Sequence, residues 1–79
     1  MAEEAERIGA RMRERRLELG LKQREVADRL PGNTEGKDVS RWEHGRHRPH
    51  SDTLEHIAEA LETDVADLYA GPDAKRREK

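Results

Sequence analysis

A basic stretch in the middle of the sequence carries the side chains whose types and spacing best suit a chemical task. Lys37 and Arg41 stand four residues apart, so on a helix they share one face, and Ser40 lies beside them. A guanidinium can donate two parallel hydrogen bonds to the O6 and N7 atoms of guanine. Arg41 is therefore the best candidate for reading a base in the major groove of DNA, and Lys37 and Ser40 can reach the same groove.

The loop that follows this stretch continues the positive charge. Residues 44–50 include Arg46 and Arg48 and no acidic residue, which favours contact with phosphate groups over a merely solvated surface. Gly45 suits the left-handed backbone position that ends a helix, and Pro49 prevents the helix from resuming. We therefore expect a helix that releases its chain into a phosphate-binding loop.

Two apolar residues of the same stretch belong elsewhere. Val39 and Trp42 are three residues apart and share a helix face, so we expect both to lie in the core. Base stacking is the weaker interpretation of Trp42, because no other aromatic residue alternates with the basic ones.

Metal binding and catalysis find little support in the sequence. His44, His47 and His50 are evenly spaced, but they cross the predicted helix end and have no carboxylate or cysteine among them, so we expect no metal and no cofactor. No Ser-His-Asp or Cys-His arrangement and no phosphate-cradling glycine loop stands in a motif context. We expect that the protein is not an enzyme.

Length and composition limit the class of protein. The 79 residues suffice for one small domain, because a chain of this size buries only about 60% of its unfolded surface. The absence of cysteine excludes a disulfide framework and suits a reducing cytosol. No apolar run approaches the roughly 20 residues that span a bilayer, and the acidic N-terminus does not resemble a secretion signal. We therefore expect a cytoplasmic protein with no membrane partner.

The net charge of −2 hides a segregation of charge along the chain. Residues 1–48 carry 12 basic and 10 acidic side chains, residues 49–74 carry none and 7, and residues 75–79 carry 4 and 1. A basic side can thus face an anionic partner while an acidic side faces away. The net charge therefore does not argue against binding to nucleic acid.

Apolar residues recur at helical spacing and predict five short helices around one core, with no strand. The predicted stripes are Ala5, Ile8, Met12, Leu17 and Leu19 in a helix over 4–19; Val26, Ala27 and Leu30 in a helix that ends at Pro31-Gly32; Val39 and Trp42 in a helix over 35–44; Leu54, Ile57, Ala58 and Leu61; and Val65, Leu68 and Tyr69. The fold class is therefore all-α, with a domain over 1–72 and a short charged tail over 73–79.

Residues that commonly begin and end helices stand at the expected boundaries. The predicted N-caps are Asn33 or Thr34 for the third helix, Ser51 for the fourth and Asp64 for the fifth. Gly20 is the predicted end of the first helix, and Gly71-Pro72 closes the last one.

The second and third predicted helices are separated by a short glycine-containing turn, as in two helices that cross at a steep angle. The segments 20–27, 39–49 and 53–61 resemble the Cro and lambda-repressor-like helix-turn-helix family, also called the XRE family. The resemblance extends from Ile8 to Tyr69, about four fifths of the chain. Each segment alone would be a weak signal, but together they are a specific one.

The resemblance implies a five-helix lambda-repressor-like fold and a set of contacts. The third helix would lie in the major groove, and the second would cross the phosphate backbone. Gln23 is similar to a family glutamine that grips a phosphate, and Arg16 and Glu43 are similar to a structural ion pair of the family. The implied DNA-binding set is Gln23, Arg24, Thr34, Lys37, Ser40, Arg41, Arg46 and Arg48.

Two departures from the family pattern affect this set. Lys22 stands where the family usually has a serine or threonine cap before the glutamine, which weakens the cap and adds a possible phosphate contact. The turn over residues 31–35 is about two residues longer than the usual family turn, which puts the start of the reading helix in doubt.

The sequence therefore predicts a sequence-specific regulator of transcription that binds double-stranded DNA. We expect a repressor of Cro type that acts by promoter occupancy, on the nucleoid of a bacterial or phage-infected cell. The family resemblance also implies a homodimer, paired through residues 66–70 at its C-terminal end, on a palindromic operator whose half-sites lie about 34 Å apart.

A protein-interaction module is the alternative function. An antitoxin or adaptor could keep this scaffold and engage a protein partner with Glu55, Glu59 and Glu62. The plainer interpretation of these acids is electrostatic orientation, with the acidic side turned away from DNA. Replacing Arg41 with alanine separates the two functions, because an antitoxin would still bind its partner.

Overall fold

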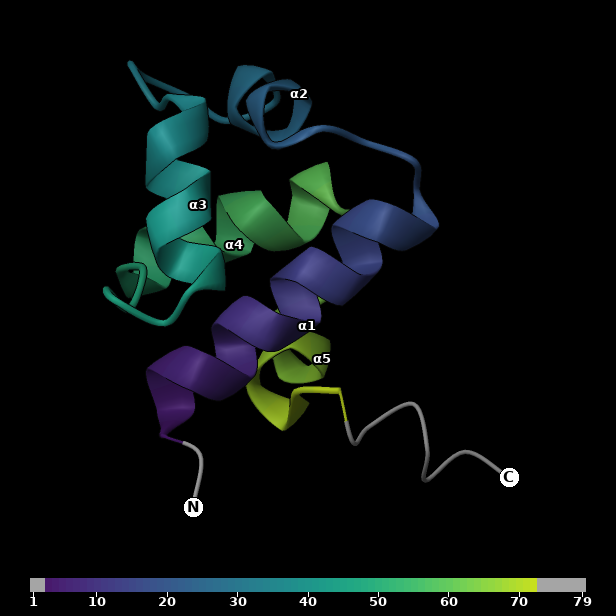
Figure 1. The fold of residues 1–79 in the computed structure, drawn as a ribbon, viewed down its shortest axis with the longest axis vertical. Helices are drawn as coiled ribbons and strands as arrows, with labels where there is room; N and C mark the ends of the chain where they lie inside the picture. Colours follow the sequence, from purple (N-terminus) through teal and green to yellow (C-terminus); the bar gives the residue numbers. More distant parts are fainter. Residues whose placement is uncertain (1–2, 73–79) are drawn as a thin grey trace.

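The computed structural model describes residues 3–72, which form five α-helices and no strand (Figure 1). The helices are α1 (Glu4–Glu18), α2 (Gln23–Asp28), α3 (Gly36–Glu43), α4 (Ser51–Ala60) and α5 (Val65–Ala70). The predicted all-α, five-helix fold class is confirmed. The predicted tail over 73–79 lies outside the described residues.

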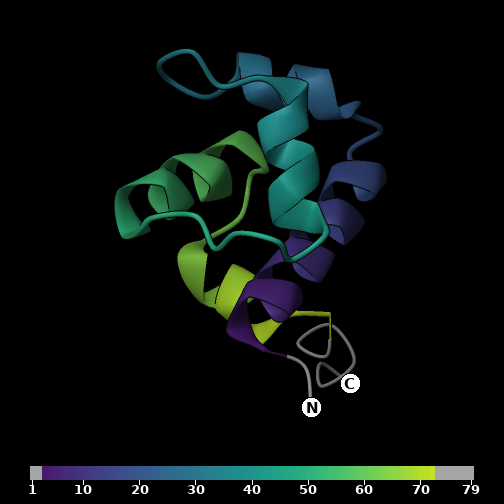
Figure 2. The ribbon, with the colours of Figure 1, turned by 60° about the vertical axis from the view of Figure 1, so that its left-hand side comes forward.

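The first helix organises the domain. In Figure 1, α1 runs diagonally across the molecule, with α5 below it and α2 and α3 above its two ends. Both α3 and α5 pack directly on α1, and α2 packs on α3. Turning the molecule brings α3 forward and shows the loop after it crossing to the start of α4 (Figure 2). Within residues 3–72, no helix has the length and apolar character needed to cross a membrane.

The core contains most of the predicted apolar stripes. Its fully or nearly buried side chains are Ile8, Met12, Val26, Ala27, Leu30, Val39, Leu54, Ile57, Ala58, Ala60, Leu61 and Leu68. Trp42 was expected in the core, but it is only partly buried and packs against the core from its edge. The prediction for Leu17 is wrong, because this side chain is 51% exposed. Leu17 is five residues from Met12, which puts it about 140° around the helix from the buried face.

Two of the predicted helix caps are wrong, and one is confirmed. The backbone N–H groups of Asp38 and Val39 donate to the carbonyl of Glu35, so Glu35 and not Asn33 or Thr34 caps α3. The side chain of Asp38 then accepts the N–H of Glu35 at 2.9 Å.

The start of α4 shifts by one residue for a similar reason. Leu54 donates its N–H to the carbonyl of His50 at 2.8 Å, so His50 is the cap and Ser51 is already helical. Asp64 does cap α5, and its carboxylate accepts the N–H of Asp67 at 2.8 Å. At the other end of α2, the helix stops at Asp28, before the predicted Pro31-Gly32.

Arginines of α1 tie the later helices in place. Arg11 donates to the carboxylate of Asp67 on α5 at 3.0 Å and to Glu14 at 2.7 Å. Desolvation by burial alone would lower the pKa of Arg11, but the hydrogen bonds to Asp67 and Glu14 and the nearby carboxylate charges raise it. Arg15 donates to the carbonyl of Leu61 at 2.9 Å, just beyond the end of α4. These contacts join helices that are far apart in the sequence.

Gly9 is the point where α3 ends against α1. A Cβ atom at Gly9 would overlap the carbonyl oxygen of Trp42 and come within 2.9 Å of the carbonyl oxygen of Glu43. Both obstacles are backbone atoms, so no side chain can move aside. We expect Gly9→Ala to lower the free energy of unfolding by about 1 to 3 kcal/mol, as measured by urea denaturation.

Gly36 provides the matched control for this variant. It is also helical with an ordinary backbone conformation, but its added Cβ would meet Arg24 at 3.5 Å, an ordinary contact. Gly36→Ala should therefore be neutral or should stabilise the domain by about 0.4 to 1 kcal/mol. Equal stability of the two variants would contradict the close approach of α1 and α3.

Candidate nucleic-acid interface

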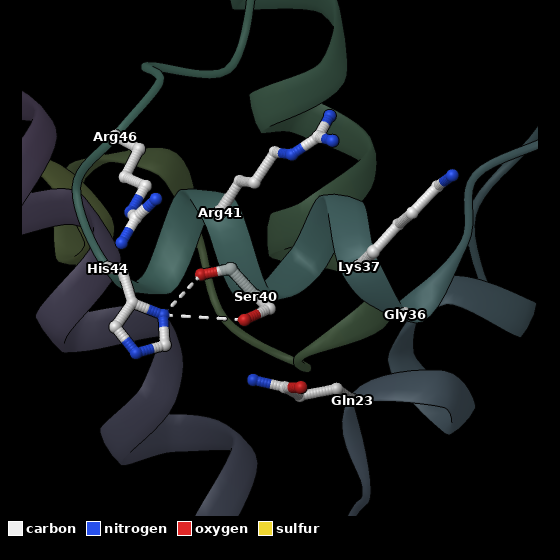
Figure 3. A pocket seen from close by; sticks show the side chains of 7 residues that line it. All are labelled: Gln23, Gly36, Lys37, Ser40, Arg41, His44 and Arg46. Carbon is white, nitrogen blue, oxygen red and sulfur yellow. Dashed lines mark hydrogen bonds between the residues drawn. The ribbon is translucent and has the colours of Figure 1, made fainter.

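One side of α3 forms a shallow polar hollow with the start of α2 and the loop after α3. Its lining residues are Gln23, Gly36, Lys37, Ser40, Arg41, His44 and Arg46. Figure 3 shows Lys37 and Arg41 extending in parallel from α3, while Gln23 of α2 lies on the side of Ser40 and Arg46 comes from the loop near His44. The structure thus brings together five of the eight residues predicted to bind DNA.

The long basic side chains of this hollow are weakly held. The side chain of Arg41 is 54% exposed, and its ion pair with Asp38 is 3.8 Å long. The side chain of Lys37 is 67% exposed and lies 3.4 Å from Glu35. Exposed ion pairs of this kind contribute little to stability, so both cations are available to another anion at small cost.

His44 belongs to the same surface, although it was not among the residues predicted to bind DNA. Its Nδ1 atom lies 2.8 Å from the carbonyl oxygen of Ser40. A carbonyl oxygen only accepts, so Nδ1 carries the proton and Nε2 is left for a ligand. The sequence held a signal for this residue, because positions 37, 41 and 44 follow the helical spacing of one face.

Gln23 is fixed by the interior of the domain. Its amide donates to the carboxylate of Glu43 at 3.1 Å, which anchors the side chain at the edge of the hollow. Glu43 in turn accepts from Arg16 at 2.6 Å and 3.0 Å, and Arg16 also donates to the carbonyl of Leu21 at 2.9 Å. This buried cluster connects α1 and the end of α3 to the start of α2.

The other three predicted DNA-binding residues lie outside the hollow. Arg24 lines a separate surface of α2 with Lys22, and the hydroxyl of Thr34 donates to the carbonyl of Pro31 at 3.3 Å within the turn. Arg48 donates to Glu4 at 3.1 Å and to the hydroxyl of Tyr69, and its guanidinium lies over the Tyr69 ring. Their contacts with DNA therefore stay predictions.

The turn before α3 ends at Glu35, and the helix begins at Gly36. The loop over 29–35 leads to Gly36, where an added Cβ atom would meet the backbone of Arg24 on α2 at 3.5 Å. Lys37 and Ser40 consequently sit on the first turns of α3 beside Gln23. Among residues 3–72, no group of side chains is arranged to hold a metal ion.

Two short helices joined by a turn, with exposed basic side chains on the second, match a known family. Residues 7–71 fit the family model described as a helix-turn-helix domain. The chain belongs to this helix-turn-helix family. The matched span nearly coincides with the region of predicted resemblance, from Ile8 to Tyr69.

Solved structures resemble this helix-turn-helix domain along most of its length. One structure of the clp gene regulator ClgR from Corynebacterium glutamicum has a TM-score of 0.81 and 25% identity, and covers 100% of both chains. A second ClgR structure has a TM-score of 0.80 and 29% identity, and covers 95% of this chain and 81% of that one. No curated protein sequence matches the chain.

A larger protein also contains a similar domain. PlcR of Bacillus thuringiensis, solved in complex with the peptide PapR7 and DNA, has a TM-score of 0.76 and 27% identity. The match covers 90% of this chain and 25% of the PlcR chain. Helix-turn-helix domains place their second helix in the major groove of DNA. The family match therefore makes this chain a DNA-binding regulator and not an enzyme.

Proposed function

We propose that this helix-turn-helix domain is a sequence-specific repressor of Cro type, which occupies promoter DNA and excludes transcription. In this proposal α3 enters the major groove, with Lys37, Ser40 and Arg41 at the base edges. The observation that carries the proposal is the exposed guanidinium of Arg41, 3.8 Å from its one ion-pair partner within residues 3–72. Such a side chain can exchange Asp38 for a guanine without a large loss of stability.

The phosphate contacts in this proposal come from both ends of the hollow. Gln23, held by Glu43, would grip one backbone where α2 begins, and Arg46 would contact it from the loop after α3. Arg24, Thr34 and Arg48 would extend the contacts along the duplex. The PlcR structure, which contains DNA, supports this use of the same fold.

The acidic residues of α4 fit an orienting role. Glu55 and Glu59 are exposed, and Figure 3 shows α4 behind α3 when the hollow faces the viewer. An acidic rear surface would be repelled by DNA while the basic front approaches it. The alternative function is an antitoxin or adaptor that binds a partner through this rear surface, with Glu55, Glu59 and Glu62. That function assigns no ligand to the basic hollow.

Selection of bound duplexes from a random pool, repeated at two salt concentrations, tests the proposal. We expect a palindromic sequence to be enriched, with guanine at the position read by Arg41 and half-sites about 34 Å apart. A homodimer on the operator would account for the palindrome. If no sequence is enriched at low salt, the repressor proposal is wrong and the result favours the adaptor function.

Salt titration of operator binding tests the phosphate contact of Arg46. The logarithm of the binding constant falls linearly with the logarithm of salt concentration, by about 0.9 for each neutralised phosphate. We expect Arg46→Ala to reduce this slope by about 0.9. Arg46→Lys keeps the charge and should keep the slope, so an unchanged slope in both variants would place Arg46 away from the backbone.

A further inference from the structure

The outer side of α1 carries a surface that the proposed function does not use. Ala10, Arg13, Glu14 and Leu17 line a shallow hollow there, together with Glu18 and Pro72. Leu17 is 51% exposed and is the one large apolar side chain of residues 3–72 classed as exposed. A single exposed leucine is ordinary on a protein surface, so it is the charged and small residues arranged around it that favour a contact.

The order of residues on this face is self-complementary. Suppose that two α1 helices lie antiparallel about a two-fold axis between positions 13 and 14. Each residue then faces the residue of the second copy for which the two residue numbers add up to 27. Arg13 then faces Glu14 of the second copy, and Glu14 faces its Arg13. Leu17 faces the small Ala10, which leaves room for the larger side chain. Opposite charges thus meet at positions 13 and 14, and a large side chain meets a small one at positions 10 and 17.

The side chain of Arg13 is available for such a pair. It is exposed, and within residues 3–72 it forms no hydrogen bond or ion pair. Glu14 is 37% exposed and uses one carboxylate oxygen to accept from Arg11 at 2.7 Å. Its second oxygen can accept from an arginine across the axis.

We propose that this face of α1 binds a second copy of the chain through an antiparallel α1 pair. This inference rests on the proposed function, because the α1 pair would supply the two-fold axis that a repressor needs on a palindromic operator. It also places the contact differently from the predicted pairing through residues 66–70. Within that predicted segment, Leu68 is fully buried in the core and Asp67 is bound to Arg11, so these two side chains are already engaged inside the domain.

The contact is weak by itself and gains strength on DNA. A stable interface buries about 800 Å² on each partner, and a row of four side chains on one helix buries less. Two adjacent half-sites hold the copies at a high effective concentration, so a weak contact becomes cooperative binding. The competing occupant of this face is the segment that follows Pro72 in the sequence, because residues 73–79 contain four basic residues and the face contains Glu14 and Glu18.

Sedimentation of the full chain up to about 1 mM, and operator binding by the same samples, test the proposal. We expect self-association that Leu17→Gln weakens at least tenfold, with an unchanged unfolding temperature because the side chain is exposed. The same variant should bind an isolated half-site normally and lose cooperativity on the palindrome. A chain that stays monomeric at about 1 mM, or a Leu17→Gln variant that associates normally, overturns the α1 pair.

Charge reversal tests the register. Arg13→Glu alone and Glu14→Arg alone each place like charges across the axis, and we expect each to weaken association at least tenfold. A mixture of the two variants restores opposite charges at both positions and should form mixed dimers. Failure of the mixture to associate overturns the register.

The remaining outcomes separate this proposal from the proposed function and from the competing occupant. A monomer whose Leu17 methyl signals shift when residues 73–79 are deleted would assign the face to the tail and overturn the α1 pair. Normal enrichment of an operator with no self-association would defeat the α1 pair and leave the repressor proposal intact. Self-association without any operator would defeat the repressor proposal alone.

Discussion

Replacing Arg41 with alanine should abolish discrimination at one position of each operator half-site, while the domain stays folded. A bidentate contact from a guanidinium to guanine contributes about 1 to 3 kcal/mol of discrimination between bases, or roughly 5-fold to 150-fold in affinity. The side chain is 54% exposed and its ion pair with Asp38 is long, so the free energy of unfolding should change by less than about 0.5 kcal/mol. Competition binding with operators substituted at each position measures the loss.

Arg41→Lys separates the effect of the positive charge from the recognition of guanine. Lysine keeps the positive charge but loses the planar pair of donors, so it should retain the salt dependence of the wild type and still lose much of the preference for guanine. Full preference in the alanine variant would show that Arg41 only solvates the surface. A repressor is expected to lose operator preference in the alanine variant, whereas an antitoxin or adaptor is expected to keep its protein partner.

The helices were predictable from the sequence because their burial follows a local rule. Leu54, Ile57, Ala58 and Leu61 repeat at helical spacing, and all four are buried in the structure. Leu17 does not follow this rule, because it lies five residues from Met12 and so about 140° around the helix from the buried face. The caps of α3 and α4 moved by a residue or two because neighbouring residues compete for the first helical hydrogen bonds.

The site residues on α3 were predictable from their spacing along one helix. The contacts of site residues with other helices were not, because they depend on how the helices pack together. Lys37, Ser40 and Arg41 share the hollow, as their spacing on α3 requires. Arg48 looked like part of a basic loop, but its partners Glu4 and Tyr69 come from α1 and α5, and no local pattern announces them. The anchoring of Gln23 on Glu43 depends in the same way on how α2 meets α3.

The second large effect concerns the buried ion pair behind the hollow. The side chain of Glu43 is 2% exposed and that of Arg16 is 11% exposed, and their closest atoms are 2.6 Å apart. Glu43→Ala would leave the guanidinium of Arg16 buried with only the carbonyl of Leu21 as partner. We expect a loss of about 3 to 5 kcal/mol in the free energy of unfolding, as measured by urea denaturation.

Such a loss is a large part of the total, because a domain of 79 residues has a stability of roughly 4 to 12 kcal/mol. The physical cause of the effect can be checked with a double variant. Arg16→Met with Glu43→Leu removes both charges and fills similar volume, so it should be much more stable than Glu43→Ala and close to the wild type. If the double variant is as unstable as the single one, the cluster stabilises the fold through the attraction itself and not by avoiding a stranded charge. The double variant should still bind operator more weakly, because it also removes the carboxylate that holds Gln23 at the edge of the hollow.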